Sequence, residues 1–180
     1  LDRVAIPTAQ SVDLTCDPER ADYTGTARVT LDVKQPTDVL RFHARALTVD
    51  SATLEGAGGA VKASAIERLE PDQVRVRFAR SIAPGTYTLA LAFHNAFNTR
   101  AISLYKVVTG GHAYLFTQFE DTEAREAYPC WDEPEFKIPW RMTLRVPAGD
   151  LAVSNTAIAS ETRAGAGKVE VFEPTRPLAS

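Results

Sequence analysis

The chain has 180 residues, 44% of them hydrophobic and 24% charged, which is the length and composition of one globular domain with a packed core. Its acidic and basic residues are interspersed and sum to a net charge of −3, which argues against nucleic acid as a main partner. No apolar run approaches the roughly 20 residues of a membrane-spanning helix, so we expect no membrane segment in this chain.

The dominant pattern is an alternation of apolar and polar residues with a period of two, which indicates strands with one face on a core and one in water. In chain order it runs through residues 12–17, 28–33, 74–78, 87–93 and 141–146. Turn signals such as Pro84-Gly85 and Gly110-Gly111 separate these runs. Many short strands predict an all-β fold, an antiparallel β-sandwich or curled sheet, with residues 1–180 forming a single domain.

One short helix is predicted near residues 121–127, between two of the strand patterns. Asp121 is a suitable N-cap residue, and Glu123 would lie in the first turn, where a negative charge is favourable. Pro129 follows the predicted end, as is usual for a residue that cannot continue a helix. We find no long amphipathic helix elsewhere in the chain.

General catalytic motifs are missing from the sequence. The histidines, His43, His94 and His112, are far apart, and although they could converge in space, ordinary surface positions are the expected interpretation. Cys16 and Cys130 form neither a disulfide framework nor a metal-ligand pair, so we interpret both as buried thiols. There is no Gly-x-Ser-x-Gly elbow and no glycine-rich phosphate loop. On this basis a stand-alone β-sandwich that binds carbohydrate or protein stays an alternative.

One segment is far more specific than the strands. Residues 117–120 read TQFE, Ala124-Arg125 follows, and residues 128–134 read YPCWDEP. This block closely resembles the signature of the N-terminal domain of M1-family zinc aminopeptidases, which are peptidases of the hydrolase class. Weaker matches follow the family order along nearly the whole chain, at residues 23–25, 40–43, 84–87, 153–155 and 172–178. The chain departs from the family pattern at Glu126, where a second arginine is common, and at Tyr128, where phenylalanine is common.

The resemblance implies that residues 1–180 form the β-rich N-terminal domain of such a metallopeptidase, inactive alone and docked on a catalytic domain that this chain lacks. In the family that following domain carries the GxMEN and HExxH motifs and the zinc, so we expect zinc in the full-length enzyme and none in this chain. The first residue is leucine and the last residues resemble a segment that leads out of the domain, so we expect a piece of a longer protein. The sequence does not indicate a cellular compartment.

The resemblance also implies two substrate-binding residues. By its place in TQFE, Glu120 would bind the α-amino group of a peptide substrate, and Gln118 would line the pocket for the first side chain. Residues two apart in a strand point to the same side, so both can face a cleft while Phe119 packs behind them. From the residues alone, Glu120 could equally be a solvated acid at a strand end, and Gln118 could bind a neighbouring loop.

The remaining residues of the motif are interpreted as structural. Pro129 and Pro134 indicate a compact turn that leaves backbone groups without strand partners, and charged side chains of Arg125, Asp132 and Glu133 can satisfy these groups. A surface role for these charges is the alternative. Cys130 lies between a proline and a tryptophan, which favours an inert, buried thiol. Trp131 and Trp140 are expected to anchor the core or a domain interface.

Overall fold

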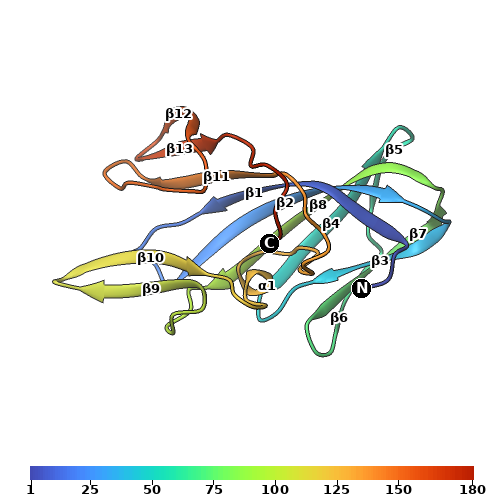
Figure 1. The fold of residues 1–180 in the computed structure, drawn as a ribbon, viewed down its shortest axis with the longest axis horizontal. Helices are drawn as coiled ribbons and strands as arrows, with labels where there is room; N and C mark the ends of the chain where they lie inside the picture. Colours follow the sequence, from blue (N-terminus) through green and yellow to red (C-terminus); the bar gives the residue numbers. More distant parts are fainter.

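The computed structural model describes residues 1–180 and confirms an almost entirely β fold (Figure 1). No helix in it has the length and apolar character that a membrane span requires. The elements in chain order are β1 (Ala5–Thr15), β2 (Asp22–Val33), β3 (Thr37–His43), β4 (Thr48–Gly56), β5 (Gly59–Lys62), β6 (Ala65–Leu69), β7 (Gln73–Ile82), β8 (Gly85–Ala96), β9 (Ser103–Thr109), β10 (His112–Gln118), α1 (Ala124–Ala127), β11 (Trp140–Pro147), β12 (Ile158–Ala164) and β13 (Gly167–Phe172).

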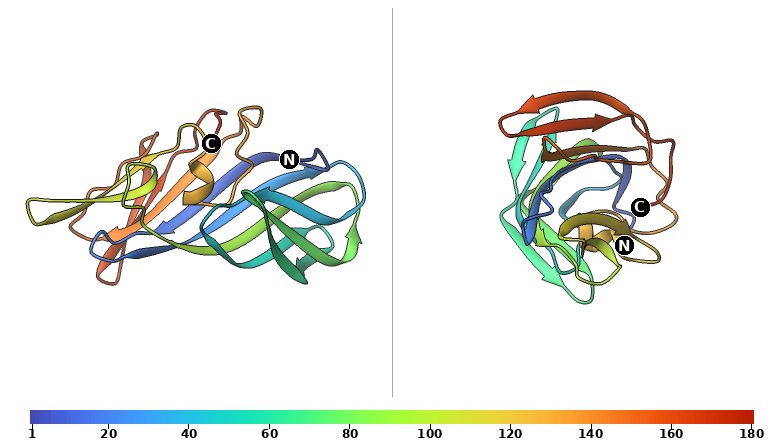
Figure 2. Two further views of the ribbon diagram at one scale, coloured as in Figure 1. Left: turned by 90° about the horizontal axis from the view of Figure 1, so that it is seen from below. Right: turned by 90° about the vertical axis from the view of Figure 1, so that its left-hand side faces the viewer.

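The strands form a large sheet of eight strands, a small sheet of three strands and a separate hairpin. The large sheet has the order β12-β13-β11-β1-β2-β8-β4-β5, the small sheet the order β3-β7-β6, and β9 pairs only with β10. The large sheet curls, and α1 lies on its concave side (Figure 2). One pairing differs from the predicted antiparallel arrangement, since β1 and β11 run parallel, with Gln10 opposite Trp140. A parallel pair needs a long crossover, which the intervening chain supplies.

The predicted inward faces of β2, β7 and β8 are confirmed. Their alternate residues are buried in one continuous core, namely Val29, Leu31, Val33, Val74, Val76, Phe78, Leu89, Leu91 and Phe93. The strand pattern of β11 has a different outcome, because Met142, Leu144 and Val146 are only half-buried. That face of β11 does not meet the small sheet, and it forms part of an open groove described below.

The β9–β10 hairpin turns through Gly110 and Gly111, which have φ values of 60° and 81°. Positive φ at both central residues is the requirement of the tight turn that suits the twist of two antiparallel strands, and glycine meets it without steric cost. The hairpin projects from the body of the domain (Figure 1). β10 ends at Gln118, so the base of the hairpin carries one of the two residues predicted to bind substrate.

Helix α1 is shorter than predicted, and Asp121 does not cap it. The helix covers Ala124–Ala127, Glu123 occupies the N-cap position, and no side chain caps the end. The residues before it form a turn in which the Glu123 N–H donates to the Phe119 carbonyl at 2.9 Å. The Asp121 carboxylate instead accepts from the neighbouring Thr122 hydroxyl at 3.4 Å. The N-cap position is therefore two residues later than the predicted cap, Asp121.

Candidate functional site

Gln118 and Glu120 lie at the base of the hairpin, and both are exposed. The strand ends at Gln118, so Glu120 stands in the turn beyond it and the alternation argument does not extend to Glu120, which corrects the prediction. The Gln118 side-chain oxygen accepts the Glu120 N–H at 3.1 Å, a local bond that fixes the backbone of the turn. The Glu120 carboxylate has no ion-pair or hydrogen-bond partner in the structure.

Phe119 holds this turn against the domain. It is half-buried, and its ring meets the Tyr128 ring edge-on, with centroids 5.6 Å apart and planes at 86°. Edge-to-face pairs of this kind are favourable because the positive ring edge meets the negative face. Tyr128 is itself 5% exposed. The aromatic side chain of the TQFE segment is thus anchored, while its two polar neighbours point to solvent.

A buried ion pair holds the two ends of the motif together. The Arg125 Nε donates to the Asp132 carboxylate at 2.8 Å, and one terminal nitrogen donates to the Asp132 carbonyl at 2.9 Å. The other terminal nitrogen contacts the Asp72 carboxylate at 3.3 Å. Arg125 and Asp132 are 9% and 8% exposed, so their charges are shielded from water and depend on one another. This pair closes the turn that residues 128–134 form.

A second arginine extends this network across the helix. Arg45 contacts the carboxylates of Glu123, the N-cap residue of α1, and of Glu126 in its first turn. The contact with Glu126 is 2.7 Å long. It also lies 3.5 Å from the same Asp72 carboxylate oxygen that Arg125 contacts. Arg45 and Asp72 belong to loops after β3 and before β7, so the network ties the turn after Glu120 to the small sheet.

His43 is the only histidine in this network. Its Nδ1 accepts the Asp132 N–H at 3.2 Å, and its own backbone pairs with that of Cys130. Burial, and then the nearby charge of Arg125, lower the pKa of His43 from 6.5 to about 4. The side chain is therefore neutral at pH 7, which is the form that can accept the Asp132 N–H.

The His43 pKa predicts a loss of stability in mild acid. His43 takes up a proton near pH 6.5 in the unfolded chain, but only near pH 4 in the folded chain. The contribution of His43 to the free energy of unfolding is therefore complete above pH 6.5, and it falls as the pH decreases from 6.5 towards 4. We expect the urea midpoint to decrease between pH 7 and pH 5. The amide oxygen of His43→Asn can accept the same N–H but does not titrate, so the urea midpoint of this variant should decrease less between pH 7 and pH 5. An equal decrease in the two proteins would contradict the low pKa of His43.

The other motif residues have mostly internal contacts. The Pro129 carbonyl accepts the Gln10 side-chain amide at 2.8 Å, and Cys130 is fully buried, which raises the pKa of its thiol well above the usual range. Trp131 is 3% exposed and packs on Phe42, with ring centroids 5.9 Å apart. Two residues of the motif are more open. The Glu133 carboxylate contacts Arg3 at 3.1 Å, and Pro134 is exposed.

The structure brings no group of three histidine, cysteine or carboxylate residues together that could hold a metal ion. His94 pairs with Asp50 at 3.0 Å, and His43 is engaged with Asp132, so the histidines do not converge. The residues of this chain therefore do not fit a zinc site.

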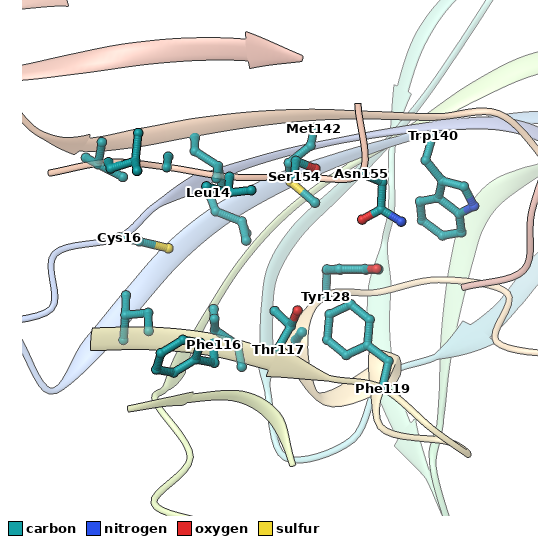
Figure 3. A pocket seen from close by; sticks show the side chains of 18 of the residues that line it. Leu14, Cys16, Phe116, Thr117, Phe119, Tyr128, Trp140, Met142, Ser154 and Asn155 are labelled. Atoms are coloured by element: carbon teal, nitrogen blue, oxygen red, sulfur yellow. The ribbon is translucent and has the colours of Figure 1, made fainter. Parts of the chain in front are cut away.

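A large apolar groove lies beside the Gln118 turn, and the sequence pattern did not reveal it. It has a volume of about 980 Å³. One wall is formed by β1 and β11, with Leu14, Cys16 and Met142, and the opposite wall by β10, with Thr117 and Phe119 at its end (Figure 3). Trp140 and Tyr128 close one end. Gln118 and Glu120 are not among the lining residues, although their neighbours Thr117 and Phe119 are.

The sequence comparisons agree with one another. The peptidase M1 N-terminal domain model matches residues 6–180. Aminopeptidase M1-C of Oryza sativa subsp. japonica is 36% identical across 100% of this chain, which corresponds to 21% of that protein. Aminopeptidase N of Acetobacter pasteurianus is 25% identical across 100% of the chain and 51% of its own length. Endoplasmic reticulum aminopeptidase 1 of Homo sapiens is 30% identical across 82% of the chain and 17% of its own length. The chain spans about a fifth of the length of its plant relatives.

Proposed function

We propose that this chain, which belongs to the peptidase M1 N-terminal domain family, is the β-rich N-terminal part of a zinc metallo-aminopeptidase that removes N-terminal residues from peptides. The names of the relatives support the activity, and the small share of their length that this chain spans supports the view that it is a part of the enzyme. Zinc would be held elsewhere in the polypeptide, where it would polarise the scissile carbonyl and activate water. Alone, the chain would be inactive.

Within that enzyme, Glu120 would bind the α-amino group of the substrate. An α-amino group has a pKa near 8, so it is largely charged at neutral pH and its natural partner is a carboxylate. A hydrogen bond between charged groups contributes about 1.5–3 kcal/mol where water is scarce. Because only the first residue of a peptide carries this ammonium, the contact also sets which peptide bond meets the metal. Gln118, beside it, would line the pocket for the first side chain.

The observation that carries this proposal is the state of the Glu120 carboxylate. It is exposed and has no internal partner, whereas Glu123 and Glu126 nearby are held by Arg45. The turn that presents it is fixed on one side by Phe119 against Tyr128 and on the other by the arginine network. An unpaired carboxylate on a fixed backbone turn suits the binding of a positively charged ligand, because binding then loses little conformational entropy of the turn.

Replacement of Glu120 by alanine in the full-length enzyme tests the proposal. We expect kcat/KM on an alanyl-amide substrate to fall by roughly 10- to 100-fold, the loss of one charged hydrogen bond. Glu120→Gln should lose part of this, because the amide retains an acceptor without the charge. Glu19→Ala, which removes another exposed acid, is the control and should leave the kinetics unchanged. Unchanged kinetics in Glu120→Ala would refute the role.

The alternative of a stand-alone binding module requires a row of exposed aromatic residues. Tyr114 and Phe116 on β10 are 46% and 49% exposed, and Phe116 stacks obliquely on Tyr105. These residues also border the apolar groove, where an interface within a longer polypeptide accounts for them equally well. The family match over residues 6–180 favours the aminopeptidase proposal. Binding of the isolated chain to a soluble oligosaccharide through Tyr114 would favour the alternative.

A further inference from the structure

Two carboxylates that follow Glu120 in the chain share one arginine. The Arg45 guanidinium contacts both Glu123 and Glu126, which lie three residues apart and are therefore neighbours on the surface of α1. All three side chains are largely shielded from water. The two ends of the helix depend on this ion-pair cluster to different degrees.

The C-terminal end of α1 is fixed to the large sheet. The Tyr23 hydroxyl, from β2, donates to the Ala127 carbonyl at 2.9 Å, and the Asn95 side-chain amide, from β8, donates to the Glu126 carbonyl at 2.9 Å. The Asn98 side-chain amide donates to the Glu126 carboxylate at 3.3 Å. None of these contacts involves an arginine, so we expect this end of the helix to stay in place without one.

The N-terminal end of α1 has fewer contacts. No side chain caps it, and the carboxylate of Glu123, at the N-cap position, contacts Arg45 and no other residue. The Glu123 N–H donates to the Phe119 carbonyl at 2.9 Å, which closes the turn that contains Glu120. The position of this turn therefore depends on Arg45 more directly than the rest of the helix does.

The backbone that presents Arg45 is itself fixed. The Arg45 N–H donates to the Arg125 carbonyl in α1, and the Ala44 N–H donates to the Asp72 carbonyl, both at 2.9 Å. The Arg45 side chain also lies 3.5 Å from the Asp72 carboxylate. Because the side chain starts from a fixed point of the backbone, its ion pairs cost less conformational entropy than those of a mobile loop.

Ala46, the next residue, shows how firmly this loop is held. Its φ of 61° is a left-handed conformation that costs free energy for a residue with a Cβ atom. The Arg68 guanidinium donates to the carbonyls of Ala44 and Leu47 on the two sides of it, and Leu47 is fully buried. Such a conformation persists where the surrounding contacts enforce it, so the loop keeps Arg45 against the helix although Ala46 is strained.

Loss of the guanidinium would act mainly on Glu123. Its carboxylate would lose its one partner, and the repulsion between it and the Glu126 carboxylate would no longer be offset. Glu126 would keep its contact with Asn98, so Glu123 is the side chain that would move toward solvent. Because the Glu123 N–H closes the turn through Phe119, the position of Glu120 would become less defined.

We propose that Arg45 is a positioning residue for recognition of the substrate α-amino group, and that it acts through Glu123 on the turn that places the Glu120 carboxylate. This inference rests on the proposed function, because it concerns the same carboxylate. The contribution of Arg45 is to the geometry of one contact, and a displacement of about 1 Å is enough to weaken such a contact.

Two hydroxamate inhibitors of the full-length enzyme separate this role from a general structural one. Alanine hydroxamate carries the α-amino group and propionohydroxamate lacks it, while both offer the same hydroxamate to the zinc. Arg45→Met keeps much of the side-chain length and removes the charge. We expect it to raise the inhibition constant of alanine hydroxamate by about 10-fold and that of propionohydroxamate by less than about twofold. An equal change for both inhibitors, or no change for either, would overturn the proposal.

Arg28→Met is the matched control. Arg28 also makes a two-bond contact with a carboxylate, that of Glu55, at 3.2 and 2.5 Å, but this pair is exposed on strands β2 and β4. Both inhibition constants should stay within about twofold of the wild-type values. A selective loss of alanine hydroxamate binding in this variant would mean that loss of an arginine charge is sufficient wherever it lies, and would overturn the assignment to Arg45.

Glu123→Ala covers the case in which Arg45→Met fails to fold. It removes the same contact from the other side and leaves Arg45 paired with Glu126 and Asp72, so the shielded charges keep their partners. We expect the same selective loss of about 10-fold for alanine hydroxamate. Normal binding of alanine hydroxamate by Glu123→Ala would overturn the route through this residue.

The Glu120→Ala background distinguishes failure of this inference from failure of the proposed function. If Arg45 acts through Glu120, adding Arg45→Met to Glu120→Ala should change the inhibition constant of alanine hydroxamate by less than about a further twofold. Additive losses would overturn the inference alone, as would a loss in Glu120→Ala without one in Arg45→Met. Unchanged binding of alanine hydroxamate by Glu120→Ala would count against the proposed function and this inference together.

Discussion

Arg125→Ala is expected to destabilise the protein by about 3–5 kcal/mol, the usual result of removing one partner from a buried ion pair. The variant leaves the Asp132 carboxylate, 8% exposed, without its bond at 2.8 Å and the Asp132 carbonyl without its bond at 2.9 Å. Asp72 loses a contact as well. The cost is mainly that of an uncompensated buried charge, so it exceeds the net contribution of the intact pair. Urea unfolding at pH 7.5 measures it.

The chain offers a matched control for this variant. Arg145 makes a comparable two-bond contact with Asp13, at 2.8 and 2.7 Å, but its side chain is 47% exposed. Water replaces the lost partner there, so Arg145→Ala should cost less than about 1 kcal/mol. If the Arg125 and Arg145 variants were equally stable, the buried network would not be the element that holds the motif.

Trp131→Ala is expected to have an effect of similar size by a different mechanism. Its side chain is 3% exposed and packs on Phe42, which is fully buried, so truncation removes apolar contacts and leaves a cavity between the motif and the small sheet. Large-to-alanine changes of aromatic core residues cost about 3–5 kcal/mol. The loss appears as a lower urea midpoint with an unchanged slope, since the surface exposed on unfolding remains similar.

Two variants bracket the Trp131 result. Trp131→Phe keeps part of the ring contact with Phe42 and should lose less than half as much stability as the alanine variant. Leu151→Ala truncates an apolar side chain that is 83% exposed and should change stability by less than about 0.5 kcal/mol. A Trp131→Ala protein as stable as Leu151→Ala would mean that the motif tryptophan is not a core anchor.

The sequence predicted those parts of the fold that depend on local periodicity. β2, β7 and β8 alternate strictly because one face is covered by the opposing sheet, and their inward residues were identified correctly. The same pattern in β11 could not show that its apolar face lies open, because coverage depends on which elements come together in space. The parallel pairing of Gln10 with Trp140 was missed for the same reason, since no short-range signal distinguishes parallel from antiparallel neighbours.

At the candidate site, resemblance was more informative than pattern. It singled out Gln118 and Glu120, whose exposed side chains have no feature that periodicity could detect. Arg45 and Asp72 were missed although they hold the helix after Glu120, because both lie in loops far from the motif and are polar residues typical of such loops. The helix cap was misplaced by two residues because a good capping residue, Asp121, is part of the preceding turn.

The parallel pairing of β1 with β11 also has a consequence for the order in which the domain can assemble. β1 lies between β2, which is adjacent in the chain, and β11, which begins at Trp140. During synthesis, the residues before Trp140 can therefore pair β1 with β2 but not with β11, and the second edge of β1 stays unpaired until β11 has been made. Pairing between strands so far apart in the sequence slows folding, because the chain between them loses conformational entropy before the β1–β11 contacts stabilise the fold. A newly made chain is consequently most vulnerable to edge-to-edge association just before β11 arrives.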